Sequence, residues 1–182
     1  GFGSKVKISG DGKILCVKSR QDIKIYQYKD NQWHLMQENF IAKTSEIQGK
    51  TVDREVRHFD ISDDGSKIIL SHEWVMPEAD TLDDDEWSTL QGFQISNSKN
   101  LNSLIEVWDA HGKSEYEKVF NTQGHSCKIS GDGSRILIGN SGGKYIEVRE
   151  RSGAKWFEQI GDTIFSRVPD FGKHVSMDYY GN

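Results

Sequence analysis

A phrase of six residues recurs three times in the sequence and limits the possible folds more than any other feature. Residues 7–12 and 128–133 both read Lys-Ile-Ser-Gly-Asp-Gly, and residues 60–65 read Asp-Ile-Ser-Asp-Asp-Gly. An apolar run follows shortly after each copy. Asp and Gly supply the side-chain acceptor and the positive φ that a tight turn between two strands needs. Each copy therefore predicts a β-hairpin.

A second phrase follows each hairpin, and in it apolar and polar residues alternate. It covers residues 23–26, 105–108 and 146–149, which read Ile-Lys-Ile-Tyr, Ile-Glu-Val-Trp and Ile-Glu-Val-Arg. Alternation with a period of two is typical of a half-buried strand. A polar turn and a strand with an aromatic residue come next, so each copy contains four strands. We expect the three aromatic side chains, at one repeat position, to pack between neighbouring sheets: Trp33, Tyr116 and Trp156.

The end of the chain repeats its beginning. Residues 171–175 align without a gap on residues 2–6, and Gly181 then falls on Gly12. We therefore expect a partial fourth copy that supplies one strand. Residues 37–51 are expected to form a connection between the first two units. The expected unit bounds are about 1–53, 54–121, 122–169 and, for the partial unit, 170–182.

Four strands per unit and a period of roughly 50 residues are typical of β-propeller blades. The sequence therefore predicts an all-β fold with a single domain over residues 1–182. It consists of β-propeller-type repeats of four-stranded antiparallel blades, three units plus the first strand of a fourth, as a partial propeller. A β-sandwich and an irregular β-solenoid are the alternatives. Because propellers close with typically four to eight blades, we expect either a piece of a longer propeller or two copies joined in a six-bladed ring.

Gly124-His125 precedes the repeated phrase of the third copy, and Trp108-Asp109 ends the alternating phrase of the second copy. With these residues the third copy resembles a blade of the WD-repeat family, and the second copy resembles the Trp-Asp ending of such blades. The phrase is also similar to repeats of bacterial TolB-like propellers. The hydrogen-bonded set that WD repeats use cannot be assembled in any one unit, so the resemblance is to a diverged propeller. It implies a platform for other proteins.

An acidic insertion lengthens the second unit. It covers residues 73–101, between the expected second and third strands. Long loops on rigid scaffolds often carry function. We expect it to dock a basic partner through acidic residues flanked by two aromatic anchors. A calcium loop and a solvated acidic loop are the alternatives. The expected partner-binding residues are Trp74, Asp83, Asp84, Asp85 and Trp87.

Several classes of function are disfavoured by the composition. The net charge of −5 lacks the basic excess of a nucleic-acid binder, and no apolar run is long enough to span a bilayer. Cys16 and Cys127 lie in alternating apolar segments and are expected to be buried free thiols. Their state favours a reducing, cytoplasmic compartment. The six histidines show no metal-ligand spacing, so neither a metal nor a cofactor is expected.

These observations predict a protein–protein interaction scaffold within a larger assembly rather than an enzyme. The expected partners are other proteins, including the remaining blades of a longer chain or a second copy, and not nucleic acid or membrane. A propeller-fold hydrolase or lyase with a funnel active site is the alternative. A cluster of ionisable residues at one end of the funnel would favour that alternative, and the sequence offers no such cluster.

Overall fold

The computed structural model describes residues 3–19, 22–38, 44–47, 50–75, 103–110, 112, 115–153 and 156–181. This part of the chain is all-β, with thirteen strands and no helix. The strands before residue 76 are β1 (Lys5–Ile8), β2 (Ile14–Lys18), β3 (Ile23–Lys29), β4 (Gln32–Gln37), β5 (Thr44–Ile47), β6 (Lys50–Ile61) and β7 (Lys67–Val75). The strands after it are β8 (Ser103–Asp109), β9 (Glu117–Gln123), β10 (Ser126–Ile129), β11 (Arg135–Asn140), β12 (Tyr145–Ser152) and β13 (Trp156–Phe165).

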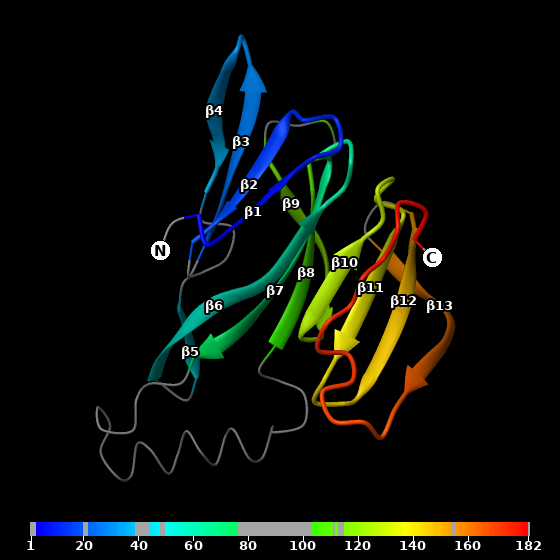
Figure 1. Cartoon of the computed structure of the whole chain (residues 1–182). Coiled ribbons are helices and arrows are strands. Elements are labelled where there is room, and N and C mark those ends of the chain that lie inside the picture. Colours follow the sequence, from blue (N-terminus) through cyan, green and yellow to red (C-terminus); the bar gives the residue numbers. More distant parts are fainter. Residues whose placement is uncertain are drawn as a thin grey trace.

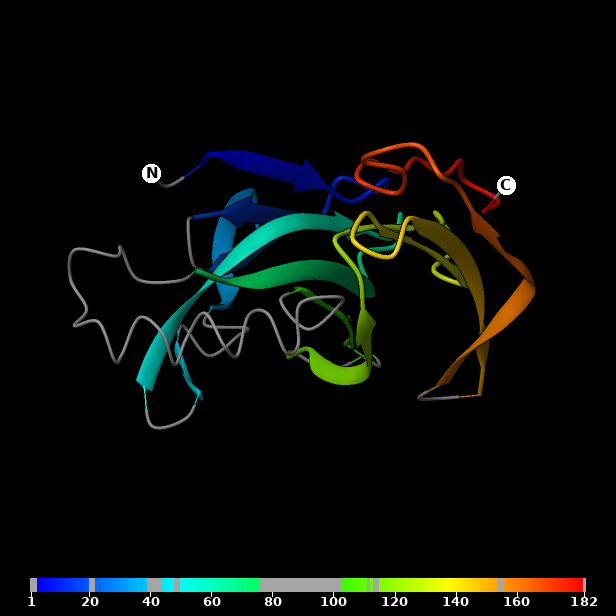
Figure 2. The ribbon, with the colours of Figure 1, turned by 90° about the horizontal axis from the view of Figure 1, so that it is seen from below.

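The strands form three antiparallel sheets of consecutive strands. The first sheet is β1-β2-β3-β4, the second is β5-β6-β7-β8-β9 and the third is β10-β11-β12-β13. Figure 1 shows the three sheets side by side, and β6 contacts both β1 and β10. Figure 2 shows the C-terminal segment (red) lying over the third sheet. Blade-like sheets in a row, with their first strands adjacent, confirm the predicted partial propeller.

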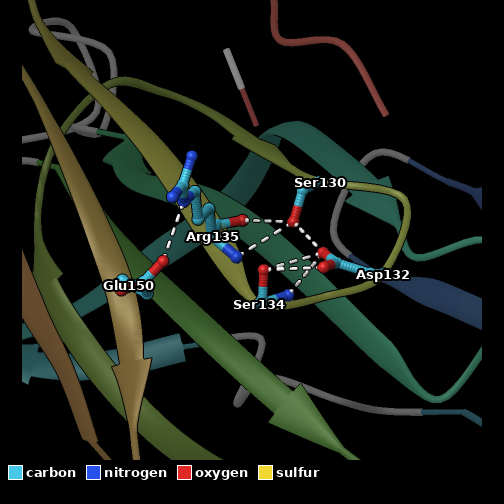
Figure 3. A network of polar contacts seen from close by, with 5 residues as sticks. All are labelled: Ser130, Asp132, Ser134, Arg135 and Glu150. Atoms are coloured by element: carbon cyan, nitrogen blue, oxygen red, sulfur yellow. Dashed lines mark hydrogen bonds and ion pairs between the residues drawn. The ribbon is translucent and has the colours of Figure 1, made fainter. Parts of the chain in front are cut away.

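The Ser-x-Asp-Gly turns have the geometry that the repeated phrase predicts. In the third copy the Ser130 hydroxyl donates to the Asp132 carboxylate at 2.6 Å, and the Asp132 carboxylate also accepts the Ser134 amide at 2.9 Å (Figure 3). Gly133 has a φ of 69°, a value that only glycine adopts readily. The hydroxyl-to-carboxylate bond recurs as Ser9 to Asp11 at 2.6 Å and Ser62 to Asp64 at 2.7 Å.

The same bonds stabilise the charged form of the three turn carboxylates. Burial on its own raises their pKa, but the hydrogen bonds outweigh it and lower the pKa of Asp11, Asp64 and Asp132. A carboxylate with a lowered folded-state pKa stabilises the fold above the unfolded pKa of about 3.9. That contribution disappears as the pH falls through the folded-state value.

Backbone hydrogen bonds join the turns of successive copies. The Asp11 amide donates to the Asp63 carbonyl at 3.0 Å, and the Asp63 amide donates to the Gly131 carbonyl at 2.7 Å. The Gly131 amide in turn donates to the Tyr179 carbonyl at 2.9 Å. Gly181 closes a turn of the same kind by donating to the Asp178 carbonyl at 3.2 Å, with a φ of 79°. The turn of the fourth copy is therefore present.

The expected first strand of the fourth copy is not formed. Residues 166–181 contain no strand. In the other copies the first strand pairs with the second strand of its own hairpin, β1 with β2 and β10 with β11. The fourth copy lacks that second strand in the described part of the chain, so its residues have no ladder to join.

Two hydrophobic cores fill the spaces between the sheets. The first lies between the first and second sheets and includes Ile25 and Phe59, with 0% and 1% of their surface exposed. The second lies between the second and third sheets and includes Ile105 and Ile136, both 0% exposed. Cys16 and Cys127 are buried free thiols, one in each core, as predicted. Each sheet is therefore held by its neighbours in the row.

The three aromatic residues that were expected at one repeat position do not share one environment. Tyr116 is 3% exposed in the first core, as predicted, and donates its hydroxyl hydrogen to the Gly65 carbonyl. The prediction is wrong for Trp33, which is 40% exposed and contacts Tyr28 on the first sheet. That side of the first sheet has no neighbouring sheet in the described part of the chain. Trp156 begins β13, but the packing of its side chain lies outside the described residues.

Two segment bounds differ from expectation. Residues 37–51 were expected to form a connection, but they include β5 and the start of β6, which pair at the edge of the second sheet. The polar sequence Thr-Ser-Glu-Ile of β5 has too little apolar pattern to predict a strand. The insertion was expected to begin at Glu73, but Glu73 continues β7, which pairs with β8 through Glu73 and Ser103.

Candidate functional site

A cavity of about 270 Å³ lies where the first strands of the copies reach their turns. β1, β6 and β10 each contribute two residues, at the same two repeat positions, and the C-terminal segment contributes Met177 at one of them. This is the place of the central funnel in a propeller. The residues around it are Lys7, Ile8, Asp60, Ile61, Asp63, Lys128, Ile129, Gly131, Met177, Asp178 and Tyr179.

Three charged residues at one repeat position form a bridge across this cavity. Lys7 Nζ lies 3.0 Å from Asp60 Oδ1, and Lys128 Nζ lies 3.3 Å from Asp60 Oδ2. Only 10% of the Asp60 side chain is exposed, so both of its oxygens are engaged away from bulk water. The two ion pairs join all three sheets at their inner strands.

The opposite end of the same strands is basic. Burial, followed by electrostatic interactions with Lys5, His174, Lys18 and Lys128, lowers the pKa of His58 to about 4. Burial and the charges of Lys128 and Lys7 also lower the pKa of Lys5. Lys5 Nζ lies 5.5 Å from the centre of the Phe59 ring, a cation–π contact. His58 is therefore neutral at physiological pH.

The turn end of the cavity is acidic and tightly packed. The side chain of Asp63 lies directly over Gly10, where an added Cβ would be 2.5 Å from its Cγ. The Tyr179 ring covers Gly131 in the same way. Asp63 and Asp178 add carboxylates at this end of the lining. The cavity thus presents ammonium and carboxylate groups along one axis and suits polar or charged groups of either sign.

The cavity is lined by acid–base groups, and neither cysteine is among its lining residues. The thiols of Cys16 and Cys127 lie near Asp60, but burial raises the pKa of Cys16 to about 12 and raises that of Cys127 further. Both thiols therefore stay protonated, and a thiol is a poor nucleophile compared with its thiolate. Within the described ranges, no group of three or more His, Cys, Asp or Glu side chains is placed to hold a metal ion.

The residues expected to bind a partner do not belong to this cavity. Trp74 lies in β7, opposite Arg54 of β6. Asp83, Asp84, Asp85 and Trp87 lie outside the described residues, so docking through the acidic insertion remains a prediction. Sequence reasoning missed Lys7, Asp60 and Lys128, although these residues open the three copies of the repeated phrase. Their alternating charge at one repeat position was the signal.

A second buried ionic cluster lies on the second sheet. Glu106 is 4% exposed and accepts from Trp108 Nε1 at 3.3 Å and from Lys118 Nζ at 3.1 Å. His72 Nε2 lies 3.6 Å from Glu106 Oε1. Burial raises the pKa of Glu106, but its bonds and charges with His72 and Lys118 outweigh that and lower the pKa. The cluster contributes to the packing of β7, β8 and β9.

We expect the Asp60→Asn variant to lower the free energy of unfolding by about 1–3 kcal/mol. Its neutral side chain leaves Lys7 and Lys128 uncompensated, and removing one partner of a buried pair is costly, less so here because the lysines are partly exposed. Added salt should recover part of the loss by screening the two lysines. Urea denaturation at low and high salt measures both effects.

The matched control is Asp162→Asn, at an exposed position of β13. It should change the free energy of unfolding by less than about 0.5 kcal/mol. Equal stability of the Asp60 and Asp162 variants would mean that the bridge contributes nothing.

Comparisons with known proteins give the fold and no closer relationship. No protein-family model matches the chain, and no curated protein matches it. A candidate 6-phosphogluconolactonase of Bacteroides fragilis is similar in structure, with a TM-score of 0.56, 14% identity and coverage of 94% of this chain and 41% of its own. The periplasmic gluconolactonase of Pseudomonas aeruginosa has a TM-score of 0.55 and 11% identity, with 91% and 40% covered.

A hypothetical selenium-binding protein of Sulfolobus tokodaii has a TM-score of 0.50 and 14% identity, with 93% of this chain and 41% of its own covered. The chain therefore spans about 40% of the length of these structures. At such identities the likeness shows a shared β-propeller fold, in agreement with the resemblance of the repeats. The part of the chain that the structure describes contains no helix long and apolar enough to cross a membrane.

Proposed function

We propose that this chain is a protein-interaction module whose first sheet is covered by an apolar β-sheet surface of a partner. The observation that carries this proposal is a set of exposed apolar side chains on one face of the first sheet. We call this face the open face. It consists of Val6, Ile8, Tyr28, Trp33 and Leu35, which are 55%, 54%, 42%, 40% and 50% exposed.

The register of the strands puts these five residues on one side of the sheet. Val6 pairs with Val17, and Ile8 pairs with Leu15. Tyr28 pairs with Trp33 across β3 and β4, and Tyr26, two residues before Tyr28, pairs with both Leu15 and Leu35. Paired residues of antiparallel strands share a face, and contiguous exposed apolar patches mark interaction sites.

The repeat indicates what kind of surface covers the open face. The residues of β6 equivalent to Val6 and Ile8 are Phe59 and Ile61, which are 1% and 7% exposed in the core against the first sheet. Those of β10 are Cys127 and Ile129, which are 3% and 5% exposed in the core against the second sheet. In both cases a preceding sheet covers these positions. A sheet with aliphatic side chains is therefore the partner that fits.

We expect the double variant Val6→Lys, Ile8→Lys to fold normally and to lose this partner. Both side chains are more than half exposed, so the stability of the isolated chain should change little. Two buried charges without partners would oppose docking. Affinity capture from the native source, followed by mass spectrometry, should show a protein that the wild type retains and the variant loses at least tenfold.

The matched control is Phe165→Lys, which changes an exposed apolar residue at the other end of the row of sheets. It should capture the same protein as the wild type. Identical capture by all three chains would contradict docking through the open face.

A funnel enzyme, a hydrolase or lyase, is the second candidate. It is supported by the charged groups that meet in the cavity, above all the bridge of Lys7, Asp60 and Lys128. Two of the structures with a similar fold are described as lactonases, so hydrolysis of gluconolactone is the first assay to try. Turnover that disappears in Asp60→Asn, with the fold retained, would favour this candidate over the interaction module.

A further inference from the structure

The third sheet ends the row with an apolar hollow of about 460 Å³ on the face that points away from the second sheet. The hollow lies between this sheet and the C-terminal segment, and Leu137 and Ile146 form its floor. Val168, Phe171 and Val175 of the C-terminal segment line its other side. The hollow and the open face are at opposite ends of the row, so binding at the hollow does not depend on the proposed function.

The repeat shows what fills this place elsewhere in the molecule. Ile146 and Val148 are equivalent to Ile105 and Val107, which are 0% exposed. In the second core those two residues pack with a pair from the next hairpin, Ile136 and Ile138 of β11, also 0% exposed. Ile68 and Leu70 of β7 occupy the same two positions in the first core.

Ile146 and Val148 themselves are only partly buried. The C-terminal segment covers the inner part of the third sheet, where Val175 and Met177 take the repeat positions of Cys127 and Ile129. The first and second cores each contain a second strand with an aliphatic pair. The space over the third sheet contains no such strand in the described part of the chain. The hollow lies at the equivalent position, and its apolar lining suits an aliphatic pair.

The C-terminal segment also presents backbone groups that a strand could use. Val175 and Met177 are partly buried while His174 and Ser176 are exposed, an alternation typical of a strand. Within the described part of the chain, residues 174–177 make no backbone hydrogen bond. The segment is held in place at both ends, by Ser126 Oγ donating to the Gly172 carbonyl at 2.8 Å and by Gly131 donating to the Tyr179 carbonyl at 2.9 Å.

We infer that the C-terminal segment and the hollow beneath it form an acceptor site for a β-strand from another polypeptide. The strand pairs with the backbone of residues 174–177, as β11 pairs with β10. Two aliphatic side chains at alternate positions fill the hollow over Ile146 and Leu137. Backbone pairing supplies affinity, and the aliphatic pair supplies selectivity, as in other cases of strand addition.

A synthetic peptide with the sequence of residues 133–140 is the probe, because it carries Ile136 and Ile138 in the spacing that the site requires. Fluorescence anisotropy of the labelled peptide should show saturable binding to the full chain. NMR shifts of the full chain should move at residues 174–177 and Ile146. A control peptide with both isoleucines replaced by lysine should bind at least tenfold more weakly.

Two variants of the chain complete the test. Ile146→Lys places a charge on the floor of the hollow and should weaken peptide binding at least tenfold, with an unchanged circular dichroism spectrum as the control for folding. Val6→Lys alters only the open face and should leave the affinity unchanged. Absence of binding, equal binding of the two peptides, or NMR shifts confined to the open face or to the edge strands β4 and β9 would overturn the inference.

Discussion

Replacing Phe59 with alanine should lower the free energy of unfolding by about 3–5 kcal/mol. Phe59 is 1% exposed and lies in β6, where its ring packs in the core between the first and second sheets. The substitution leaves a cavity that the sheets cannot close without moving together, and it removes the ring under the Lys5 ammonium. The loss is a large share of the 5–15 kcal/mol that stabilises an ordinary domain. Urea denaturation followed by tryptophan fluorescence measures it.

Trp33→Ala is the matched control, because it removes a larger aromatic ring from an exposed site on the first sheet. It should cost less than about 1 kcal/mol, since most surface substitutions have small effects. If Phe59→Ala does not fold, Phe59→Leu should fold with a loss under about 1.5 kcal/mol, because it nearly conserves volume. Equal losses for Phe59→Ala and Trp33→Ala would contradict the placement of the core.

Gly139→Ala should release the C-terminal segment from the third sheet. A Cβ on Gly139 would clash with the Gly172 carbonyl oxygen and with Ser126 Oγ, and it would lie 2.8 Å from a methyl carbon of Val175. Because one of these atoms belongs to the backbone, the segment has to shift as a whole. Overpacking of this kind costs about 1–3 kcal/mol. Hydrogen exchange should show faster exchange at the Gly131 amide, which donates to Tyr179.

Gly153→Ala is the control, and it tests whether replacing any glycine of the third sheet with alanine would release the C-terminal segment. Nothing lies within 4 Å of a Cβ at Gly153, although its φ is 76°. It should therefore cost about 1–2 kcal/mol of backbone strain and leave the Gly131 amide protected. Loosening of the C-terminal segment by both variants, or by neither, would show that close packing at Gly139 does not hold the segment.

The fold was predictable where the chain repeats a local chemical requirement. Each Ser-x-Asp-Gly phrase contains the hydrogen-bond acceptor and the glycine that its turn needs. Asp132 therefore accepts its hydrogen bond and Gly133 adopts its positive φ without help from the rest of the fold. Trp33 shows the limit of prediction from a repeat, because a side chain at its position is buried only when another sheet packs against that face. The strand expected near Val175 is not formed for a similar reason, because a strand needs a neighbouring strand with which to pair. Local pattern predicts an element, and its neighbours decide whether the element is buried or paired.

The cavity was harder to foresee than the strands. Lys7, Asp60 and Lys128 lie far apart in the sequence, and no spacing rule brings them together. They meet because equivalent positions of successive inner strands converge on one axis, which only the assembled row of sheets creates. An alignment of the copies would have shown that charges of opposite sign occupy this one repeat position. Most of the partner-binding residues expected in the acidic insertion lie outside the described residues.

The bonds that join the turns also bear on how such a chain acquires its stability. Each bond links one turn to that of the next copy, so every added copy brings a bond of the same kind to its neighbour. Repeat proteins built in this way gain free energy in proportion to length, and their folding can start in any copy and spread along the chain. Because most contacts join neighbouring strands of the same sheet, the search for native contacts need not slow as copies accumulate. Lengthening such a protein by duplication is then favourable from the first extra copy.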